Sequence, residues 1–452
     1  MCGTYGCFDV EFTTKLQWLY ERGGLSQAYP RIWHTEMLLT EVLCDMEEAG
    51  LLIDVDYLEA LRDSLKGVKH TLQVDIEATL GSEINLGSDD EIRTVLRALR
   101  CNLIKKTKKG QFSVDREVLE SFAHHHPVLA KVLEWRDAEK LYSTYTASIL
   151  DRLDKDNVLH PDFQQAGTDT GRLSCCEPNF QNQPTDNNAR AIKWTGQSLE
   201  DGGVDPWSIR RAYVVRPEGV RVFFDYSQIE LRVMAFYSKD PIMVDAYLRG
   251  EDIHSRTSME VFGTTEKAKR RDAKILNFGL SYGMTEKGFA YQTKKPLEEA
   301  AEYMTRFFER YHGIKTFREG FWGYVRQHQC RFQNIFGRPR YLPGIISMDK
   351  WTRLRAERQA IATLIQGTAA EVTKESLVRV WQAFKTEGLE AQIVSTVHDE
   401  IQVDCQRYEL MSVCRIMKGA MEAFPEFDPI PVIVNGDYTT TSWADKKALP
   451  PM

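Results

Sequence analysis

Two aspartates in widely separated parts of the chain each follow a short apolar run that reads as a strand. Asp225 follows residues 220–224, and Asp399 follows residues 393–397 at the tip of a predicted hairpin. Two such strands lying side by side would bring both carboxylates to one end of a sheet. Carboxylates paired in this way bridge two divalent cations about 3.5–4 Å apart, an arrangement that serves in-line phosphoryl displacement. Because turns favour Asp for their own geometry, either segment alone is read more simply as a solvated turn.

A second set of residues combines cationic and aromatic side chains at helical spacing. Arg270, Lys274, Phe278 and Tyr282 recur every four positions, so on a helix they would form one slowly drifting stripe. The Arg and Lys side chains could grip a triphosphate, and the two rings could lie against a base or sugar. Considered by itself, the segment is also a basic amphipathic helix whose aromatic residues belong to the core.

Local signals predict the elements that must position these residues. Ser227-x-x-Glu230 is a capping box ahead of an apolar run, which predicts a helix starting at Ser227 and leaves Asp225 at the rim of the sheet. The polar, turn-rich stretch 168–182 carries Arg172 and several amides, which are donors suited to phosphate, sugar and minor-groove base edges. As a surface loop, the same stretch would need no ligand.

Two long helices are predicted in the first third of the chain. The pattern is helical from Glu36 to Leu65, and a second helix covers residues 128–149. The basic loop Lys105–Lys109 between them reads equally as a solvated charge run or as a contact with a phosphate backbone. The apolar positions at helical spacing are Leu58, Leu61, Leu65, Val68 and Leu72 in the first helix, and Val128, Val132, Trp135, Tyr142, Tyr145 and Ile149 in the second.

Composition sets the limits of these interpretations. The chain is 42% hydrophobic and 27% charged, which is typical of a globular protein, and its length of 452 residues allows two to four subdomains. The net charge of −7 means that a nucleic-acid partner would need local basic patches. No apolar run approaches the roughly 18 residues of a membrane span. Nine cysteines without a Cys-x-x-Cys pair indicate a reducing compartment and argue against structural zinc, so we expect a cytoplasmic protein.

Taken together and in order, these motifs resemble those of a known family. The segments at Asp225, at 270–283 and at 397–400 are similar to motifs A, B and C of family A DNA polymerases, the class of bacterial DNA polymerase I and its phage relatives. The stretches 172–181 and 336–343 resemble two further segments of that family. The resemblance runs from about residue 35 to the C-terminus.

The resemblance implies an α+β right-hand polymerase fold with a palm built on a mainly antiparallel sheet, helical fingers and a helical thumb. The implied divisions are 1–34 as a remnant of an exonuclease C-terminal helix with a linker, 35–155 as the start of the core and the thumb, 156–235 as palm with motif A, 236–335 as fingers with motif B, and 336–452 as palm with motif C. Only Tyr5–Asp9 resembles an exonuclease motif, so we expect no intrinsic proofreading.

Carried to the matching positions, the resemblance also implies residue roles. Asp225 and Asp399 would bind two Mg²⁺ ions, with Mn²⁺ as a substitute, the Tyr226 carbonyl as a further ligand and Glu400 in support. Lys274 would donate a proton to the leaving pyrophosphate. The nucleotide contacts would be Glu230, His254, Arg270, Lys274, Phe278 and Tyr282, with Glu230 excluding a 2′-hydroxyl. The DNA contacts would be Arg172, Asn179, Gln181, Gln366, His398, Lys105 and Lys106.

The expected activity is template-directed DNA synthesis from a primer, with primer–template DNA and deoxynucleoside triphosphates as partners. We expect a monomer in the cytoplasm of a bacterial cell or phage-infected host, with no membrane association. A separate exonuclease or processivity subunit is a further candidate partner. Two alternatives stay open: a single-subunit RNA polymerase-like enzyme, and an inactive DNA-binding subunit. Glu230 and Phe278 argue against the first, and the intact metal and triphosphate positions argue against the second.

Overall fold

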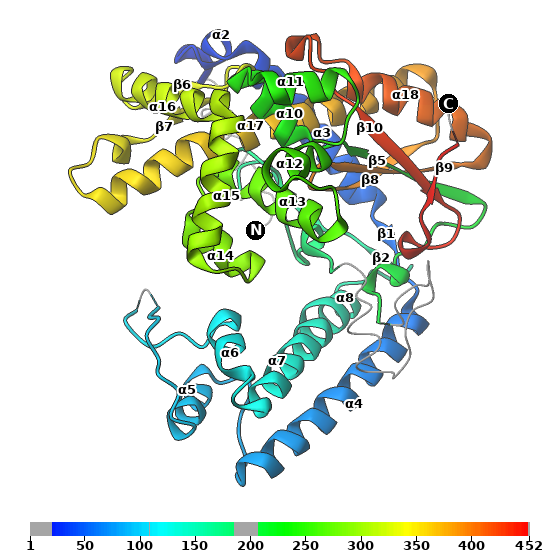
Figure 1. Ribbon diagram of the computed structural model, residues 1–452. Coiled ribbons are helices and arrows are strands. Elements are labelled where there is room, and N and C mark those ends of the chain that lie inside the picture. The colour runs from blue at the N-terminus through cyan, green and yellow to red at the C-terminus, as the bar shows by residue number, and fades with distance from the viewer. Residues whose placement is uncertain (1–19, 108, 185–206, 451–452) are drawn as a thin grey trace.

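The computed structural model describes residues 20–107, 109–184 and 207–450. The predicted exonuclease remnant at Tyr5–Asp9 lies outside these residues. In Figure 1 a sheet and its packed helices form the upper part of the molecule, and the long helices α4 and α7 extend below it. In the described part of the chain, no helix is both long and apolar enough to cross a membrane.

A five-stranded antiparallel sheet forms the centre of the upper part. Its strands lie in the order β11-β10-β5-β9-β8. Their bounds are β5 (Gly219–Tyr226), β8 (Gln392–Val397), β9 (Glu400–Gln406), β10 (Val434–Thr439) and β11 (Lys447–Ala448). α18 (Leu410–Glu422) packs against β5, β9 and β10, while α3 (Pro30–Ala49) packs against β8. The 38-residue helix α17 (Lys350–Glu387) contacts α3, α18 and β8, so much of its length is buried.

A buried ion pair holds the register between β5 and β9. Arg221 lies directly opposite Asp404, and its side chain is fully buried. Its Nε donates to Asp404 Oδ1 at 2.6 Å and its Nη2 to Oδ2 at 2.9 Å. Four residues further along β5, the same register places Asp225 opposite Glu400. Shifting the pairing by one residue would move these side chains to the opposite face.

The lower part contains two long helical segments and a small separate core. Their bounds are α4 (Val55–Leu80), α5 (Asp89–Ala98), α6 (Arg116–Ala123), α7 (Pro127–Lys140), a π-helical segment (Leu141–Ala147) and α8 (Ser148–Leu150). The core at the far end of this part consists of Ile76, Leu86, Ile92, Leu96, Val114, Val118, Leu119, Val128, Leu129, Val132 and Leu133.

The predicted continuous helix from Glu36 to Leu65 is wrong. α3 ends before Gly50 (φ 58°), and α4 begins after Asp54, whose side chain caps it by accepting from Tyr57 N. A Cβ on Gly50 would lie 2.8 Å from the Leu159 carbonyl oxygen, because β1 (Leu51–Leu52) pairs there with β2 (Val158–Leu159). The second predicted helix, over 128–149, is confirmed: the chain is helical from 127 to 150, with π-helical geometry over 141–147.

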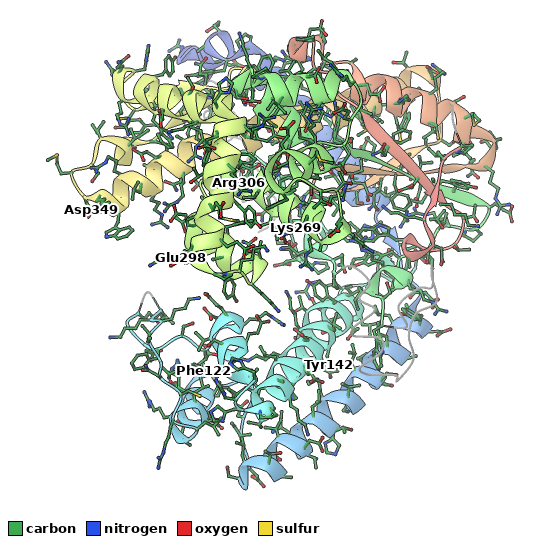
Figure 2. The ribbon with its side chains drawn as sticks, in the orientation of Figure 1. Phe122, Tyr142, Lys269, Glu298, Arg306 and Asp349 are labelled. Atoms are coloured by element: carbon green, nitrogen blue, oxygen red, sulfur yellow. The ribbon has the colours of Figure 1, made fainter. Side chains whose placement is uncertain are left out.

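Helices dominate residues 229–327. They are α10 (Ile229–Ser238), α11 (Pro241–Leu248), α12 (Ile253–Phe262), α13 (Lys267–Ser281), α14 (Glu286–Thr293), α15 (Leu297–Arg310) and α16 (His312–Gln327). Two short hairpins lie outside the central sheet, β3 (Asp162–Gln164) with β4 (Ser174–Cys176) and β6 (Arg331–Gln333) with β7 (Pro339–Tyr341). Figure 2 shows Lys269 of α13 and Arg306 of α15 on neighbouring helices of this region.

Removing one partner of the Arg221–Asp404 pair should destabilise the fold. Arg221→Met would leave the nearly buried Asp404 with only the part-exposed Arg216, 3.3 Å away, as a counter-ion, which lowers the free energy of unfolding by about 3 kcal/mol. The double variant Arg221→Met/Asp404→Leu should recover most of that loss, because two apolar groups then replace the pair. Urea unfolding of the three proteins measures both values. A single variant as stable as the parent would show that the pair does not hold the strands.

Candidate active site

The two aspartates converge at one end of the central sheet, as the sequence predicts. β8 and β9 form a hairpin with His398 and Asp399 at its tip, and His398 adopts φ 57° there. Because β9 pairs with β5, Asp225 lies opposite Glu400 and the Tyr226 N–H donates to the Asp399 carbonyl at 3.3 Å. Three carboxylates therefore gather where two neighbouring strands meet the hairpin tip.

The carboxylates disfavour one another's ionisation. Desolvation by the surrounding protein, together with the charges of Glu400 and Asp399, raises the pKa of Asp225 to about 7, although solvent reaches its side chain. Burial also raises the pKa of Asp399. Neither Asp225 nor Asp399 has an ion-pair partner in the described ranges, which leaves their oxygens free to bind a cation.

These oxygens fit a hard divalent cation. Mg²⁺ takes one or two carboxylates and completes its coordination with water and substrate phosphate. Within residues 20–107, 109–184 and 207–450, no group of three or more His, Cys, Asp or Glu side chains is arranged to hold a metal ion by itself. The site thus offers two unpaired carboxylates and the nearby Tyr226 carbonyl, and it would draw its remaining ligands from solvent and substrate.

The predicted capping box at Ser227 is wrong. α10 begins at Ile229, and its N-cap Gln228 adopts a left-handed conformation (φ 55°) without a side-chain cap. Glu230 is not available for capping, because its carboxylate pairs with Arg172. The Ser227 carbonyl instead accepts from Arg232 Nε at 2.7 Å. The strand-to-helix connection is therefore held by side chains of α10 and of the 168–172 turn.

Arg172 lines a cavity of about 260 Å³ beside the carboxylates. The predicted DNA contacts that share this cavity with Asp399 are Arg172, Asn179, Gln181 and His398. The turn that carries Arg172 lies against α17, where a Cβ on Gly367 would approach the Thr170 carbonyl oxygen to 2.9 Å. Gln366 precedes that glycine, so it lies close to the turn, although it does not line the cavity.

The cationic stripe lies on α13, as predicted, except for Tyr282, which follows the last helical residue Ser281. Arg270 Nε donates to Asp252 Oδ2 at 2.8 Å, and Lys274 is exposed with no ion-pair partner in the described parts of the chain. The Phe278 ring lies 5.6 Å from the His254 ring, between centroids. The hydroxyl of Tyr282 is buried and finds no hydrogen-bond partner among the described residues.

His254 is held inside this helical region by a buried network. Asn277 Nδ2 lies 3.0 Å from His254 Nδ1, Thr257 donates to Asn277 Oδ1 at 3.0 Å, and the Thr257 hydroxyl lies 2.8 Å from that of Tyr311. Burial lowers the pKa of His254 to about 4, and the positive charges of Arg270 and Lys274 act in the same direction. At neutral pH His254 is therefore uncharged, and a phosphate would meet a hydrogen-bond donor there.

The lysines of the 105–109 loop do not join this cluster. Lys105 pairs with Asp115 and Glu117, and the Lys106 ammonium lies 5.6 Å from the centre of the Phe112 ring. The positive charge of the loop is therefore partly neutralised by neighbouring acids.

One charged residue near the carboxylates was missed by the sequence interpretation. Lys446 pairs with Glu400 and lies over the Phe223 ring, 4.0 Å from its centre. No local motif marks it, because β10 and the segment after it bring it back to the sheet.

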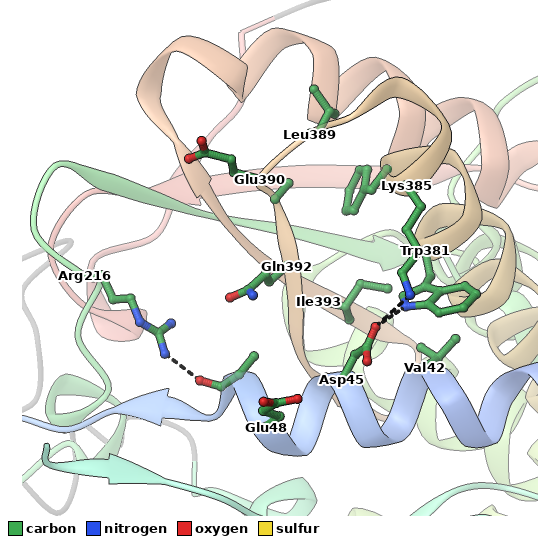
Figure 3. Close-up of a pocket in the computed structure, with 13 residues that line it drawn as sticks. Val42, Asp45, Glu48, Arg216, Trp381, Lys385, Leu389, Glu390, Gln392 and Ile393 are labelled. Carbon is green, nitrogen blue, oxygen red and sulfur yellow. Dashed lines mark hydrogen bonds and ion pairs between the residues drawn. The ribbon is translucent and has the colours of Figure 1, made fainter. Parts of the chain in front are cut away.

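Another pocket, of about 570 Å³, lies between α3, the end of α17 and the start of β8 (Figure 3). Two of its charged groups pair with each other, because Asp45 lies 3.2 Å from Lys385 Nζ, and Asp45 also accepts from Trp381 Nε1 at 2.7 Å. None of the predicted site residues lines it. The cavity beside Asp399, together with α13, is therefore the candidate active site.

Comparisons with known proteins identify the family to which the chain belongs. The family model described as DNA polymerase family A matches residues 55–445. DNA polymerase I of Bacillus caldotenax is 34% identical over 420 residues, covering 91% of this chain and 46% of that protein. The thermostable DNA polymerase I of Thermus thermophilus is 34% identical over 439 residues, covering 94% and 48% respectively. The chain therefore spans about half the length of the curated relatives it matches.

A solved structure is also similar. The POL domain of Pol1 from M. smegmatis, in complex with DNA primer-template and dNTP, has a TM-score of 0.81 and 31% sequence identity, covering 91% of this chain and 70% of that chain. This likeness confirms the expected fold class, α+β with the right-hand arrangement of palm, fingers and thumb.

Neutralising Asp225 should stabilise the protein in metal-free buffer. Since the folded-state pKa of about 7 lies above the ordinary value of 3.8, the carboxylate destabilises the fold at high pH. Asp225→Asn should raise the free energy of unfolding at pH 8 by about 1 kcal/mol, a modest value because solvent screens the exposed carboxyl. The gain should shrink as the pH falls from 7 toward 4. Denaturant unfolding at several pH values measures it, with Asp245→Asn, on the surface of α11, as the control. A gain independent of pH would contradict the repulsion.

Proposed function

Because the chain belongs to DNA polymerase family A, we propose that it catalyses template-directed addition of deoxynucleotides to the 3′ end of a primer, with release of pyrophosphate. The observation that carries the proposal is the convergence of Asp225 and Asp399 at one end of the sheet. α10, which follows Asp225, contacts the cationic helix α13, so the two halves of the site adjoin.

In this proposal Asp225, Asp399 and the Tyr226 carbonyl would hold two Mg²⁺ ions. When bound, such ions neutralise charge on the transferring phosphoryl group and on both the attacking and leaving oxygens. The rigid antiparallel pairing of β5 and β9 keeps the two carboxylates in place before substrate arrives. Rigid placement of this kind is what allows charged groups to favour the transition state.

The nucleotide side of the site would lie along α13. Arg270 and Lys274 would bind the triphosphate as cations, while the uncharged His254 would contribute a hydrogen bond. Lys274, exposed and without an ion pair among the described residues, would donate a proton to the leaving pyrophosphate. Phe278 would lie against the incoming sugar and base, and Tyr282 would lie where the template base enters.

The remaining contacts would select and hold the substrates. Glu230, buried and oriented by Arg172, would close the space that a 2′-hydroxyl needs. Arg172, Asn179, Gln181 and His398 would contact the DNA from the cavity beside Asp399. Gln366 would add a contact from α17, and Lys105 and Lys106 would approach the phosphate backbone from the thumb. We further propose that this polymerase acts without intrinsic proofreading, which a time course on a 3′-labelled mismatched primer would test.

Primer extension with deoxy- or ribonucleotides tests the proposal as a whole. We expect extension of a primed template by deoxynucleotides only, in the presence of Mg²⁺. Preferential use of ribonucleotides, or efficient initiation without a primer, would favour an RNA polymerase-like enzyme. Binding of primer–template without any extension would favour a DNA-binding subunit.

Loss of either central aspartate should separate synthesis from DNA binding. Asp225→Ala or Asp399→Ala should abolish primer extension, because the phosphoryl group then loses its metal-ion clamp. Primer–template affinity, measured by fluorescence anisotropy, should stay within about threefold, since these contacts lie elsewhere. The matched control is Asp245→Ala, which removes a surface carboxylate paired with Arg249. Synthesis retained by either variant would refute the metal assignment.

A hydroxyl added to the ring at position 278 should relax selection at the sugar. Phe278→Tyr would place a donor beside the 3′ position of the incoming nucleotide, where a dideoxynucleotide lacks its own hydroxyl. Discrimination against dideoxynucleotides should fall about tenfold or more, the value of one good hydrogen bond. Competitive incorporation on a sequencing gel measures the ratio, with Phe262→Tyr on α12 as the control. An unchanged ratio would contradict a sugar contact for Phe278.

A further inference from the structure

One face of the central sheet concentrates acidic residues around Asp225. Side chains two residues apart on a strand point to the same face, as do directly opposed residues on neighbouring strands. Phe223 therefore shares a face with Asp225, and Gln402 and Glu400 lie opposite them on β9. Asp437 on β10 lies opposite Phe223 on the other side. Four acids in all, Asp225, Asp399, Glu400 and Asp437, contribute to the electrostatic field at this end of the sheet.

Lys446 is the cation that lies against this face. Its ammonium pairs with Glu400, the residue opposite Asp225, and lies 4.0 Å from the centre of the Phe223 ring. Its side chain is 21% exposed and that of Glu400 is 14% exposed, so the pair is largely shielded from solvent. The positive charge of Lys446 favours ionisation of Asp225 and so partly offsets the repulsion among the carboxylates.

Both carboxylate oxygens of Glu400 are already bound within the protein. Oε2 pairs with Lys446, and Oε1 accepts from Gln402 Nε2 at 2.7 Å. Asp225 and Asp399, in contrast, have no ion-pair partner in the described ranges. The three neighbouring carboxylates therefore differ: Asp225 and Asp399 can accept an external cation, whereas Glu400 already pairs with Lys446.

Contacts made by residues just before and just after Lys446 in the sequence hold its backbone in place. Three residues earlier, the buried Trp443 ring stacks on Phe180 at 5.3 Å, and its backbone N–H donates to Tyr213 O at 2.9 Å. Three residues later, Leu449 N–H donates to Gly436 O of β10 at 3.0 Å. Lys447, the next residue, is exposed on the edge strand β11, opposite Tyr438. The segment therefore presents one lysine to the acidic face and the other to solvent.

We propose that Lys446 is a positioning residue that keeps Glu400 out of the metal coordination sphere and sets the affinity of the Asp225–Asp399 pair for divalent cations. This inference rests on the proposed function for the role of the two aspartates. Without the ammonium, Glu400 would be free to turn toward a bound ion as a third carboxylate, and the site would carry one more uncompensated negative charge. Both effects tighten cation binding, and tighter binding slows the release of metal with product.

Mn²⁺ binding to the full chain, without DNA or nucleotide, tests this inference by a readout that does not require catalysis. Loss of the free-ion signal in electron paramagnetic resonance gives the dissociation constant. Lys446→Met should tighten Mn²⁺ binding about tenfold, as expected for removing a unit charge close to a divalent ion in a partly shielded site. Lys446→Gln, which also removes the charge, is a second variant in case the methionine protein folds poorly; it should tighten Mn²⁺ binding too, but by less, because the amide can still donate to Glu400. Lys446→Arg should restore the parental affinity.

Two matched variants make the test specific. Lys447→Met removes the same charge from the neighbouring exposed position and should leave the affinity within about twofold of the parent, because solvent and salt screen it. The double variant Lys446→Met/Glu400→Gln should lose most of the gain, because the freed carboxylate is then absent. Unchanged or weaker binding in Lys446→Met, or a gain that persists in the double variant, would overturn the inference.

If the parent extends primers while Lys446→Met binds Mn²⁺ with the parental affinity, the inference fails and the proposed function stands. A parent that neither binds Mn²⁺ nor extends primers would overturn both.

Discussion

The antiparallel pairing of β5 with β9 is the constraint on which the site depends. One register places Arg221 opposite Asp404 in the interior and Asp225 opposite Glu400 at the end of the sheet. The buried ion pair favours this register because any slip would leave a charge in the sheet without its partner. Since side chains alternate between faces, the same slip would also turn Asp225 away from the hairpin tip. The backbone hydrogen bonds between β5 and β9 therefore fix both the buried Arg221–Asp404 pair and the position of Asp225.

The site gathers several carboxylates, and only some of them have a counter-ion within the protein. Asp225 and Asp399 have raised pKa values and no ion-pair partner among the described residues, so they carry an unfavourable interaction that a divalent cation would relieve. Glu230 and Glu400 each have an internal cation, Arg172 and Lys446 respectively. Functional sites commonly accept such repulsion at the expense of stability.

The proposed nucleotide side of the site differs from the carboxylate side, because its groups are cations and a neutral histidine carried by helices. α13 leaves Lys274 exposed and ties Arg270 to Asp252, while the neighbouring His254 is buried and held by Asn277. Burial removes the charge of the imidazole at neutral pH, so this region combines two cations with a neutral donor. The palm carboxylates are fixed by strands, whereas these groups are carried by helices that contact the palm through α10.

Short-range patterns in the sequence were sufficient for the strands before Asp225 and Asp399, the hairpin between β8 and β9, and the cationic helix α13. Each of these depends on spacing within a few residues, and the structure places each where the pattern indicated, with Tyr282 just beyond the helix end. The capping box at Ser227 failed because Glu230 has a stronger partner in Arg172, 58 residues earlier in the chain. The helix predicted over 36–65 failed because a strand pair formed with residues 158–159 breaks it at Gly50. Lys446 lay beyond any local signal, since its contact with Glu400 exists only after β10 and its flanking contacts fold the segment back over the sheet. Local sequence determined which groups were available for chemistry, and only the tertiary structure decided which charges would be neutralised, because that depends on partners brought together from distant parts of the chain.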